Sequence, residues 1–437
     1  MRNSQRRDGR VTRSLALTAA ASLTALSAVS GPLMPSPAAV MSLAGNGECT
    51  YPAKPIKGTP WSLQRVMLDQ LWQDTKGKDK DGRPVRVAVI DTGVDNSNAQ
   101  LKEAVDAELG TEVLPPRKKK KKKKEEEAAD EEGMEKGKKG DGTDDLVGHG
   151  TKVAGIIAAR PHPDTGFVGI APEARIIPIR QNDEKGSGTT DTMATAIDKA
   201  VAAHAQVINI SQDTIKPLRA NNKLQQAVRN ALNENVVVVA SAGNDGVDGK
   251  LRETYPAAYD GVLAVGASDR NNERAAFSQS GDFVDVAAPG VEMVSTVPKG
   301  GQCVDNGTSF SAPYVAGVAA LIRAKHPDWE QNQVVAQIEQ TAERSINNRD
   351  SRVGWGVVDP VRALTEDEEA IDRVTLDKGA DADVDSPDPA PLTVGETPQE
   401  RKERLATYVL GGAAVLVAVT AGLATVLNER RRRRAAK

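Results

Sequence analysis

Three residues of the types that together perform nucleophilic catalysis lie in separate short segments of the chain. Asp91 follows the apolar run of VRVAVIDTGVD, His149 stands between two glycines in GHGTKVAGIIA, and Ser309 precedes the helical pattern of NGTSFSAPYVAGVAALIRA. A serine hydroxyl is a weak nucleophile until a histidine accepts its proton, and the imidazole needs a carboxylate to hold its tautomer and stabilise its positive charge. The three residue types therefore predict a hydrolase with an Asp–His–Ser triad.

Each residue alone has an ordinary structural explanation. An aspartate after a strand often caps a turn or binds a metal, a histidine at the start of a helix can face solvent, and a serine before a helix is a common N-cap. The joint pattern favours catalysis, because all three residues are flanked by Gly or Thr and stand at a strand-to-helix edge. Pro313 is expected in the first turn of the helix after Ser309, where its missing N–H costs little.

A fourth segment offers a donor for the negative charge that develops on a substrate carbonyl. In VVVVASAGNDG, residues 236–246, Asn244 follows an apolar strand and lies in a glycine-containing turn. We expect its side-chain amide to donate to the oxyanion together with the backbone N–H of Ser309.

Alternating strands and helices are the elements that must position these residues. Continuous apolar strands separated by amphipathic helices indicate a parallel sheet covered on both faces, and catalytic groups collect at the carboxyl ends of such strands. The sequence therefore predicts a doubly wound α/β domain. The strand candidates are Val85–Ile90, Ala174–Ile179, Gln206–Ile210, Asn235–Ala240 and Val262–Gly266.

The four segments, in the order Asp91, His149, Asn244 and Ser309, resemble the subtilisin-like serine proteases of peptidase family S8 over about residues 61–364. The resemblance implies a seven-stranded parallel sheet and an endopeptidase without a cofactor. It also implies the individual roles: Asp91 orients His149, His149 is the general base and then the general acid, Ser309 attacks the scissile carbonyl, and Asn244 helps to form the oxyanion hole.

The same resemblance implies that Ser211, Gln212 and Asp213 bind substrate, together with Gly243. Members of the family generally have a glycine near the position of Asp213, in the segment that pairs with substrate backbone. A carboxylate at this position is expected either to favour a basic side chain of the substrate or to hinder ordinary peptides.

The two ends of the chain predict its compartment. Residues 1–30 place five arginines before an uncharged Ala- and Leu-rich run, which is the order of a secretory signal peptide cleaved as late as about residue 39. The alternative, a short membrane anchor, has marginal length. Residues 407–427 contain no charge and are long enough for one transmembrane helix, and the basic tail 428–437 is expected in the cytoplasm by the positive-inside rule.

This layout narrows the resemblance to the mycosins, the membrane-anchored subtilisin-like proteases of type VII secretion systems. An N-terminal extension, residues 31–60, precedes PWSLQRVMLDQLW at residues 60–72, and an acidic, proline-containing linker, residues 365–406, precedes the predicted membrane helix. The resemblance implies cleavage of secreted substrates, contact with membrane components of the secretion system, and an extension that wraps the catalytic domain and stays attached.

The two cysteines, Cys49 and Cys303, are too few for a disulfide-dense scaffold or a four-cysteine zinc site. Outside the cytoplasm a disulfide between them is expected, and two free thiols are the alternative. Asp141, Asp144 and Asp145 cluster before the His149 segment, but without the spacing of a calcium loop, so we expect solvated carboxylates and no metal.

Charge patterning adds two expectations. The formal net charge of −3 gives the chain no general affinity for nucleic acid. A charged insert, residues 96–144, interrupts the α/β pattern and contains the lysine run 118–124 followed by an acidic stretch. Such blocks are usually solvated, and binding of an anionic lipid or polymer is the alternative.

Three functions fit these observations. The first is an active endopeptidase at the outer face of the cell membrane, acting on protein or peptide substrates. The second is a structural component that stabilises a secretion complex, and the third is a general cell-surface subtilisin. The complete catalytic set favours the first, because a scaffold has no physical need for four correctly placed groups.

Overall fold

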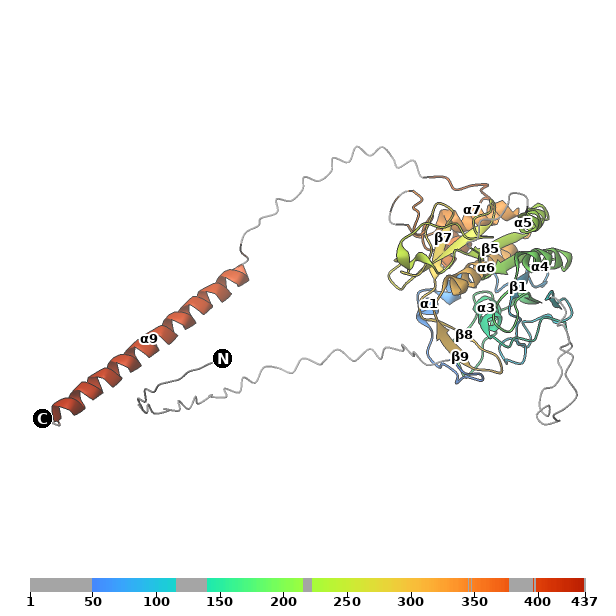
Figure 1. The fold of residues 1–437 in the computed structure, drawn as a ribbon. Helices are drawn as coiled ribbons and strands as arrows, with labels where there is room; N and C mark the ends of the chain where they lie inside the picture. Colours follow the sequence, from blue (N-terminus) through green and yellow to red (C-terminus); the bar gives the residue numbers. More distant parts are fainter. Residues whose placement is uncertain are drawn as a thin grey trace, which may run out of the picture. The chain divides into compact units, whose positions relative to one another are not determined.

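The structure, a computed structural model, describes two units of the chain, which are treated separately (Figure 1). The predicted signal peptide, the lysine run and much of the predicted acidic linker lie outside the described residues. The described residues are 49–114, 140–214, 222–344, 346, 348–376, 396 and 398–435.

A seven-stranded parallel sheet forms the centre of the first unit, in the order β2-β3-β1-β4-β5-β6-β7. The predicted α/β fold and its sheet are confirmed, and all five strand candidates are found within two residues at either end. The strands are β1 (Arg86–Asp91), β2 (Thr111–Glu112), β3 (Arg175–Arg180), β4 (Val207–Ile210), β5 (Val237–Ser241), β6 (Leu263–Ser268) and β7 (Val286–Pro289). A separate antiparallel pair consists of β8 (Met293–Thr296) and β9 (Gln302–Asp305).

Helices cover both faces of the sheet, as the alternation of side chains along each strand requires. On β1, Val87 and Val89 pack with α3 (His149–Ala158) and α6 (Thr308–Lys325) on one face. Ala88 and Ile90 pack with α4 (Thr190–Ala202) and α5 (Lys223–Asn233) on the other. The smaller helices are α1 (Trp61–Gln64), α2 (Leu68–Leu71), α7 (Gln331–Thr341), α8 (Pro360–Thr365) and the 3₁₀ turn η1 (Gly246–Asp248).

Helix α6 is almost entirely buried, and its proline does not lie where the sequence suggested. The helix begins at Thr308, so Pro313 lies in its second turn rather than its first. A proline there cannot donate to the carbonyl four residues earlier, which is that of Ser309. The hydroxyl of Ser211 donates to this carbonyl instead, at 2.9 Å. A residue at the end of β4 therefore compensates for the missing N–H inside α6.

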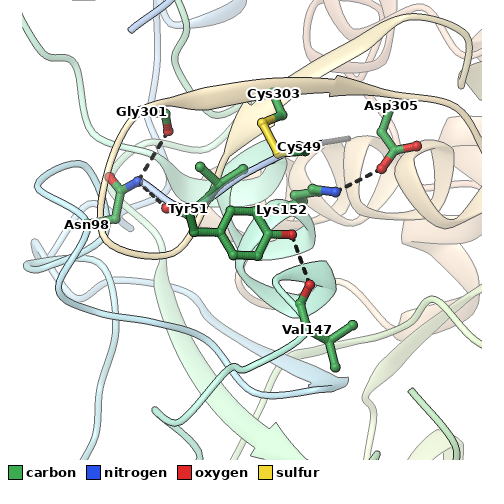
Figure 2. The surroundings of a disulfide bond; sticks show 9 residues. Cys49, Tyr51, Asn98, Val147, Lys152, Gly301, Cys303 and Asp305 are labelled. Carbon is green, nitrogen blue, oxygen red and sulfur yellow. Dashed lines mark hydrogen bonds and ion pairs between the residues drawn. A yellow bond between two sulfur atoms is a disulfide. The ribbon is translucent and has the colours of Figure 1, made fainter. Parts of the chain in front are cut away.

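A disulfide cross-links the N-terminal extension to a distant strand of the first unit. Cys49 and Cys303 form a disulfide, as expected, with their Cα atoms 6.2 Å apart and a sequence separation of 254. Further along the extension, the backbone N–H of Ile56 donates to the side chain of Gln302 at 2.9 Å. The disulfide, which Figure 2 shows, and this hydrogen bond both hold the extension to β9.

We expect the double substitution Cys49→Ser with Cys303→Ser to lower the free energy of unfolding by about 2–4 kcal/mol. The bridge closes a very long loop, and its loss gives the unfolded chain more conformational freedom. Denaturant unfolding of the double variant measures the change, and the parent chain treated with a reductant is the matched control. An unfolding midpoint that neither change moves would contradict this expectation.

The two tryptophans around α1 and α2 anchor the segment at residues 60–72. The indole N–H of Trp61 donates to the carbonyl of Val291, and that of Trp72 donates to the carbonyl of Ile170, both at 2.9 Å. A buried indole N–H needs such a partner. These two hydrogen bonds fix residues 60–72 to two distant parts of the first unit.

Much of the predicted charged insert belongs to the fold. Leu101 and Ala104 are fully buried, and β2 adds an edge strand beside β3. On the other side of the insert, Asp144 pairs with Arg180 at 2.9 Å. The described parts of the insert, residues 96–114 and 140–144, are therefore part of the first unit, and the lysine run lies outside the described residues.

The second unit contains one long helix, α9 (Pro398–Ala435). Its most apolar stretch has a mean hydropathy of 2.2, and its 38 residues are long enough to cross a bilayer. Within this unit its large apolar side chains, such as Leu410 and Leu416, are exposed. The helix contains the span 407–427 predicted from the sequence.

Candidate active site

Asp91 and His149 form the central contact of the site. Asp91 is the last residue of β1 and is fully buried, and His149 is the first residue of α3. The Nδ1 atom of His149 lies 2.8 Å and 3.0 Å from the two carboxylate oxygens of Asp91. An ionised carboxylate accepts from Nδ1–H, which leaves Nε2 as the basic nitrogen of the ring.

A second buried carboxylate holds the loops that carry this pair. Asp145 accepts hydrogen bonds from the hydroxyl of Thr92 at 2.8 Å, from the N–H of Gly148 at 2.7 Å and from the hydroxyl of Thr151 at 2.6 Å. Thr92 follows Asp91 directly, while the other two donors flank His149. Asp145 therefore fixes the end of β1 and the start of α3 to each other.

The two glycines around His149 permit close approaches that other residues would prevent. Gly148 has a φ of 83°, and a Cβ added there would lie 2.2 Å from the hydroxyl of Tyr51. A Cβ added at Gly150 would lie 2.1 Å from the carbonyl oxygen of Gly93. The glycine pattern of the His149 segment therefore reflects tight packing against the β1 turn and the extension.

Tyr51 connects the disulfide-bound extension to the histidine loop. Its hydroxyl donates to the carbonyl of Val147 at 2.9 Å, two residues before His149 (Figure 2). Beside it, the ammonium of Lys152 pairs with Asp305 at 2.8 Å. Burial raises the pKa of Tyr51 above its ordinary value, and the nearby Lys152 partly opposes this increase. Tyr51 is therefore a neutral donor to the histidine loop.

Burial and charge act in opposite directions on His149. Desolvation alone lowers the pKa of the imidazole, because it disfavours the charged form. The charge of Asp91 and its hydrogen bond, with a further contribution from the charge of Asp145, more than offset this effect. The pKa of His149 therefore lies above its ordinary value.

Ser309 is the second residue of α6 and faces the end of β4. Its hydroxyl donates to the carbonyl oxygen of Ser211 at 3.1 Å rather than to His149, while the ring of Phe310 lies 5.6 Å from the imidazole between ring centres. In return, the hydroxyl of Ser211 donates to the carbonyl of Ser309. A rotation about the Cα–Cβ bond of Ser309 is therefore needed to direct its hydroxyl elsewhere.

Asn244 presents its amide donors at the start of α6. Its Oδ1 accepts from the backbone N–H of Thr308 at 2.9 Å and from the Thr308 hydroxyl at 3.0 Å, and the residue is otherwise exposed. Because Thr308 holds this oxygen, the side-chain NH₂ group of Asn244 can donate to a bound substrate. The N–H of Ser309 has no acceptor inside the helix, and the α6 dipole adds partial positive charge there. This arrangement suits a developing anion.

A groove of about 720 Å³ extends from His149 along the end of β4. The residues that line the groove include Ser211, Gln212 and Asp213 after β4, together with residues of the loop 181–189 before α4. The carboxylate of Asp213 reaches Gly243, where a Cβ built on the glycine would lie 3.0 Å from Oδ2. The four residues expected to bind substrate are thus close to one another.

Comparison with known proteins shows the family. The profile of the subtilase family, peptidase S8, matches residues 82–356. The chain belongs to the subtilase family. It is 35% identical to Mycosin-4 of Mycobacterium tuberculosis (strain ATCC 25618 / H37Rv) over 404 residues, 83% of this chain and 81% of that protein. It is 37% identical to Subtilisin E of Bacillus subtilis (strain 168) over 262 residues, 60% of this chain and 61% of that protein.

Solved structures of related proteases have the same fold as this subtilase. MycP3 protease from the type VII (ESX-3) secretion system is 32% identical with a TM-score of 0.58, over 72% of this chain and 91% of that one. MycP1 from Mycobacterium smegmatis is 29% identical with a TM-score of 0.59, over 79% of this chain and 91% of that one. The resemblance to subtilisin-like proteases and mycosins is therefore confirmed, and the chain is a serine protease of the subtilisin type.

Sequence reasoning missed the supporting residues of this subtilase's site and misjudged one of them. Asp145 was expected to be solvated, but it is buried because Thr92, Gly148 and Thr151 donate to it. Tyr51 carried no signal in the sequence, since its partner Val147 is distant along the chain. Within the described residues, no group of three or more His, Cys, Asp or Glu side chains is placed to hold a metal ion.

Proposed function

We propose that this subtilase is a serine endopeptidase in which Asp91, His149 and Ser309 are the catalytic residues. The proposal is supported above all by the 2.8 Å contact between Asp91 and the Nδ1 atom of His149 beside the N-terminus of α6. Asn244 and the N–H of Ser309 are the two donors to the oxyanion. The substrate backbone lies along Ser211 and the groove beside it.

The proposed reaction begins when Ser309 turns from the carbonyl of Ser211 towards Nε2 of His149. Its oxygen forms a bond to the scissile carbonyl carbon as its proton moves to Nε2, and Asp91 stabilises the resulting imidazolium. The carbonyl oxygen becomes an anion between Asn244 and the Ser309 N–H. The C–N bond then breaks, and His149 gives its proton to the leaving amine.

Water completes the cycle. Its proton passes to Nε2 of His149 while its oxygen attacks the acyl carbon, and the ester bond to Ser309 breaks with return of a proton to the serine oxygen. The raised pKa of His149 suits the first task, because a stronger base accepts the serine proton more readily.

We propose that the protease acts on secreted proteins at the outer face of the cell membrane. The apolar helix α9 supports anchoring, and the arginines near its end favour a cytoplasmic position for that end. The disulfide supports an oxidising compartment for the catalytic unit. Similarity to MycP3 and MycP1 proteases, described as belonging to type VII secretion systems, supports association with such a system.

Complementation of a strain that lacks this gene tests the secretory role. The full chain is expected to restore export of the system's substrates and to remain in the membrane fraction. The chain truncated after residue 397 is the matched control for anchoring and is expected in the soluble fraction. If Ser309→Ala restores both export and substrate processing, the proteolytic role is wrong, whereas restored export with unprocessed substrate means that a structural role accompanies proteolysis.

A further inference from the structure

One carboxylate beside the candidate nucleophile has no counterpart in the reaction described above. Asp213 lies two residues after Ser211, whose carbonyl accepts from the Ser309 hydroxyl. Its Oδ2 packs against Gly243, and the N–H of Gly243 donates to the hydroxyl of Thr308 at 3.2 Å. Gly243 and Thr308 therefore lie between the carboxylate of Asp213 and the nucleophile Ser309.

The position of Asp213 depends on Gly243. This glycine has a φ of 101°, and a Cβ on it would meet Oδ2 of Asp213 and a methyl group of Thr254, each at 3.0 Å. The missing side chain leaves room for the carboxylate between the β4 and β5 loops. A peptide carbonyl held between Ser309 and Asn244 places the side chain of its own residue beside these two loops. The carboxylate thus lies on the path of that side chain.

Asp213 also lacks a compensating charge. Within the described parts of the chain, no side chain forms an ion pair with it and no group donates a hydrogen bond to it. Among the described residues, the charge that acts on Asp213 is that of Asp245, which is also negative. Asp213 is exposed in the groove, so a substrate cation can reach its carboxylate. A cation there would offset the repulsion between the two negative charges.

We infer that Asp213 makes this subtilase select substrates with lysine or arginine on the acyl side of the scissile bond. The inference rests on the proposed function, because it names the substrate class of the same site. The cationic side chain enters between the β4 and β5 loops and pairs with Asp213, while Asp245 adds to the attraction. A neutral side chain of equal length leaves the two carboxylates uncompensated.

The charge state of Asp213 gives the selection a pH dependence. Although Asp213 is exposed in the groove, partial desolvation by the surrounding protein atoms, and then the charge of Asp245, raise its pKa to about 6. The other charged residues of the described segment 245–255 are Asp248, Lys250, Arg252 and Glu253, and of these Arg252 pairs with Asp248. Below its pKa Asp213 is neutral and loses its attraction for a cation, whereas lysine and arginine stay charged. Selectivity for basic side chains should therefore rise as pH increases through about 6.

Two covalent probes that differ in one charge test the inference. Peptidyl diphenyl phosphonates carry either the lysine or the norleucine analogue next to phosphorus, and each inactivates the full chain in detergent. At pH 8 we expect the lysine probe to react up to about fivefold faster, the scale of a solvent-accessible ion pair. The ratio of the two inactivation rates should fall at pH 5. Protonation of His149 slows both probes equally and therefore does not change this ratio.

Variants identify the source of the selection. Asp213→Asn should bring the ratio close to one, while Asp213→Glu, which keeps the charge, should retain part of it. Each ratio compares two probes on the same variant, so a general loss of activity in that variant does not change it. Asp198→Asn removes an exposed carboxylate of α4 outside the groove and is the matched control for net charge.

The outcomes separate this inference from the proposed function. A fluorophosphonate without a peptide side chain reports the activated serine alone. If it labels the parent but lysine and norleucine probes react equally, or Asp213→Asn keeps the preference, the selection by Asp213 is wrong and the protease remains. If nothing labels the folded chain, both ideas are wrong.

Discussion

Replacing Ser309 by alanine is expected to lower kcat for peptide hydrolysis by about 10⁶-fold. The hydroxyl is the atom that forms the acyl bond, and no other group in the described site can take its place. Asn244, the α6 N-terminus and the groove remain, so the variant should still bind peptides and retain a small rate above the uncatalysed reaction. Steady-state hydrolysis of a peptide mixture by the purified chain measures the loss.

Ser311→Ala is the matched control for this substitution. Ser311 is a buried serine two residues along the same helix, and its hydroxyl has no hydrogen-bond partner among the described residues. Its removal should leave most of the activity. Equal losses in the two variants would mean that any change at this end of α6 disrupts the site, and the assignment of Ser309 as nucleophile would be wrong.

Replacing Asp91 by asparagine is expected to lower kcat/KM by about 10⁴-fold. The amide is close in shape to the carboxylate, but it offers an N–H donor towards Nδ1 and favours the wrong tautomer of His149. It also removes the charge that stabilises the imidazolium in the transition state. The loss should therefore appear mainly in kcat, because the groove that binds the peptide is unchanged.

The pH profile of the Asp91→Asn variant separates a catalytic role from a structural one. The negative charge of Asp91 raises the pKa of His149 against the opposing effect of burial, so its removal lowers that pKa. The rise of kcat/KM on the acidic side, which needs neutral His149, should move to lower pH. Asp164→Asn is the control, since it removes the carboxylate 3.8 Å from a half-buried histidine outside the site, His162. An unchanged profile for Asp91→Asn would contradict the proposed pairing.

The fold could be predicted wherever burial imposed a strong pattern on the sequence. Strands β1, β3, β4, β5 and β6 are covered on both faces, and that position demands the continuous apolar runs from which they were identified. Strand β7 was missed because VAAP is short and ends in proline. Strand β2 has two half-buried residues at the sheet edge and carries no periodic signal.

The catalytic candidates could be predicted because their chemistry restricts residue type at several places at once. Asp91, His149, Asn244 and Ser309 are recognisable as a set, although each alone has an ordinary explanation. The structure adds geometry that no local pattern contains. The hydrogen bond from Ser211 to the Ser309 carbonyl is possible because Pro313 lies in the second turn of α6 and leaves that carbonyl without its helical donor, and this depends on where the helix begins.

The supporting contacts could not be predicted because they join residues that are far apart in the chain. Tyr51 reaches the carbonyl of Val147 only because the disulfide and the neighbouring contacts hold the extension against β9. Asp145 was misjudged for a related reason. An aspartate in an acidic stretch looks solvated, and only the folded turn shows that Thr92 and Thr151 donate to it.

The most direct test of the central claim is the mass of the full chain, purified in detergent, before and after treatment with a fluorophosphonate. We expect one adduct on the parent and on Ser311→Ala, and none on Ser309→Ala, because only a serine activated by His149 attacks the reagent at a useful rate. An adduct that persists in Ser309→Ala, or a folded parent that forms none, would contradict the assignment of Ser309, His149 and Asp91 as a working triad.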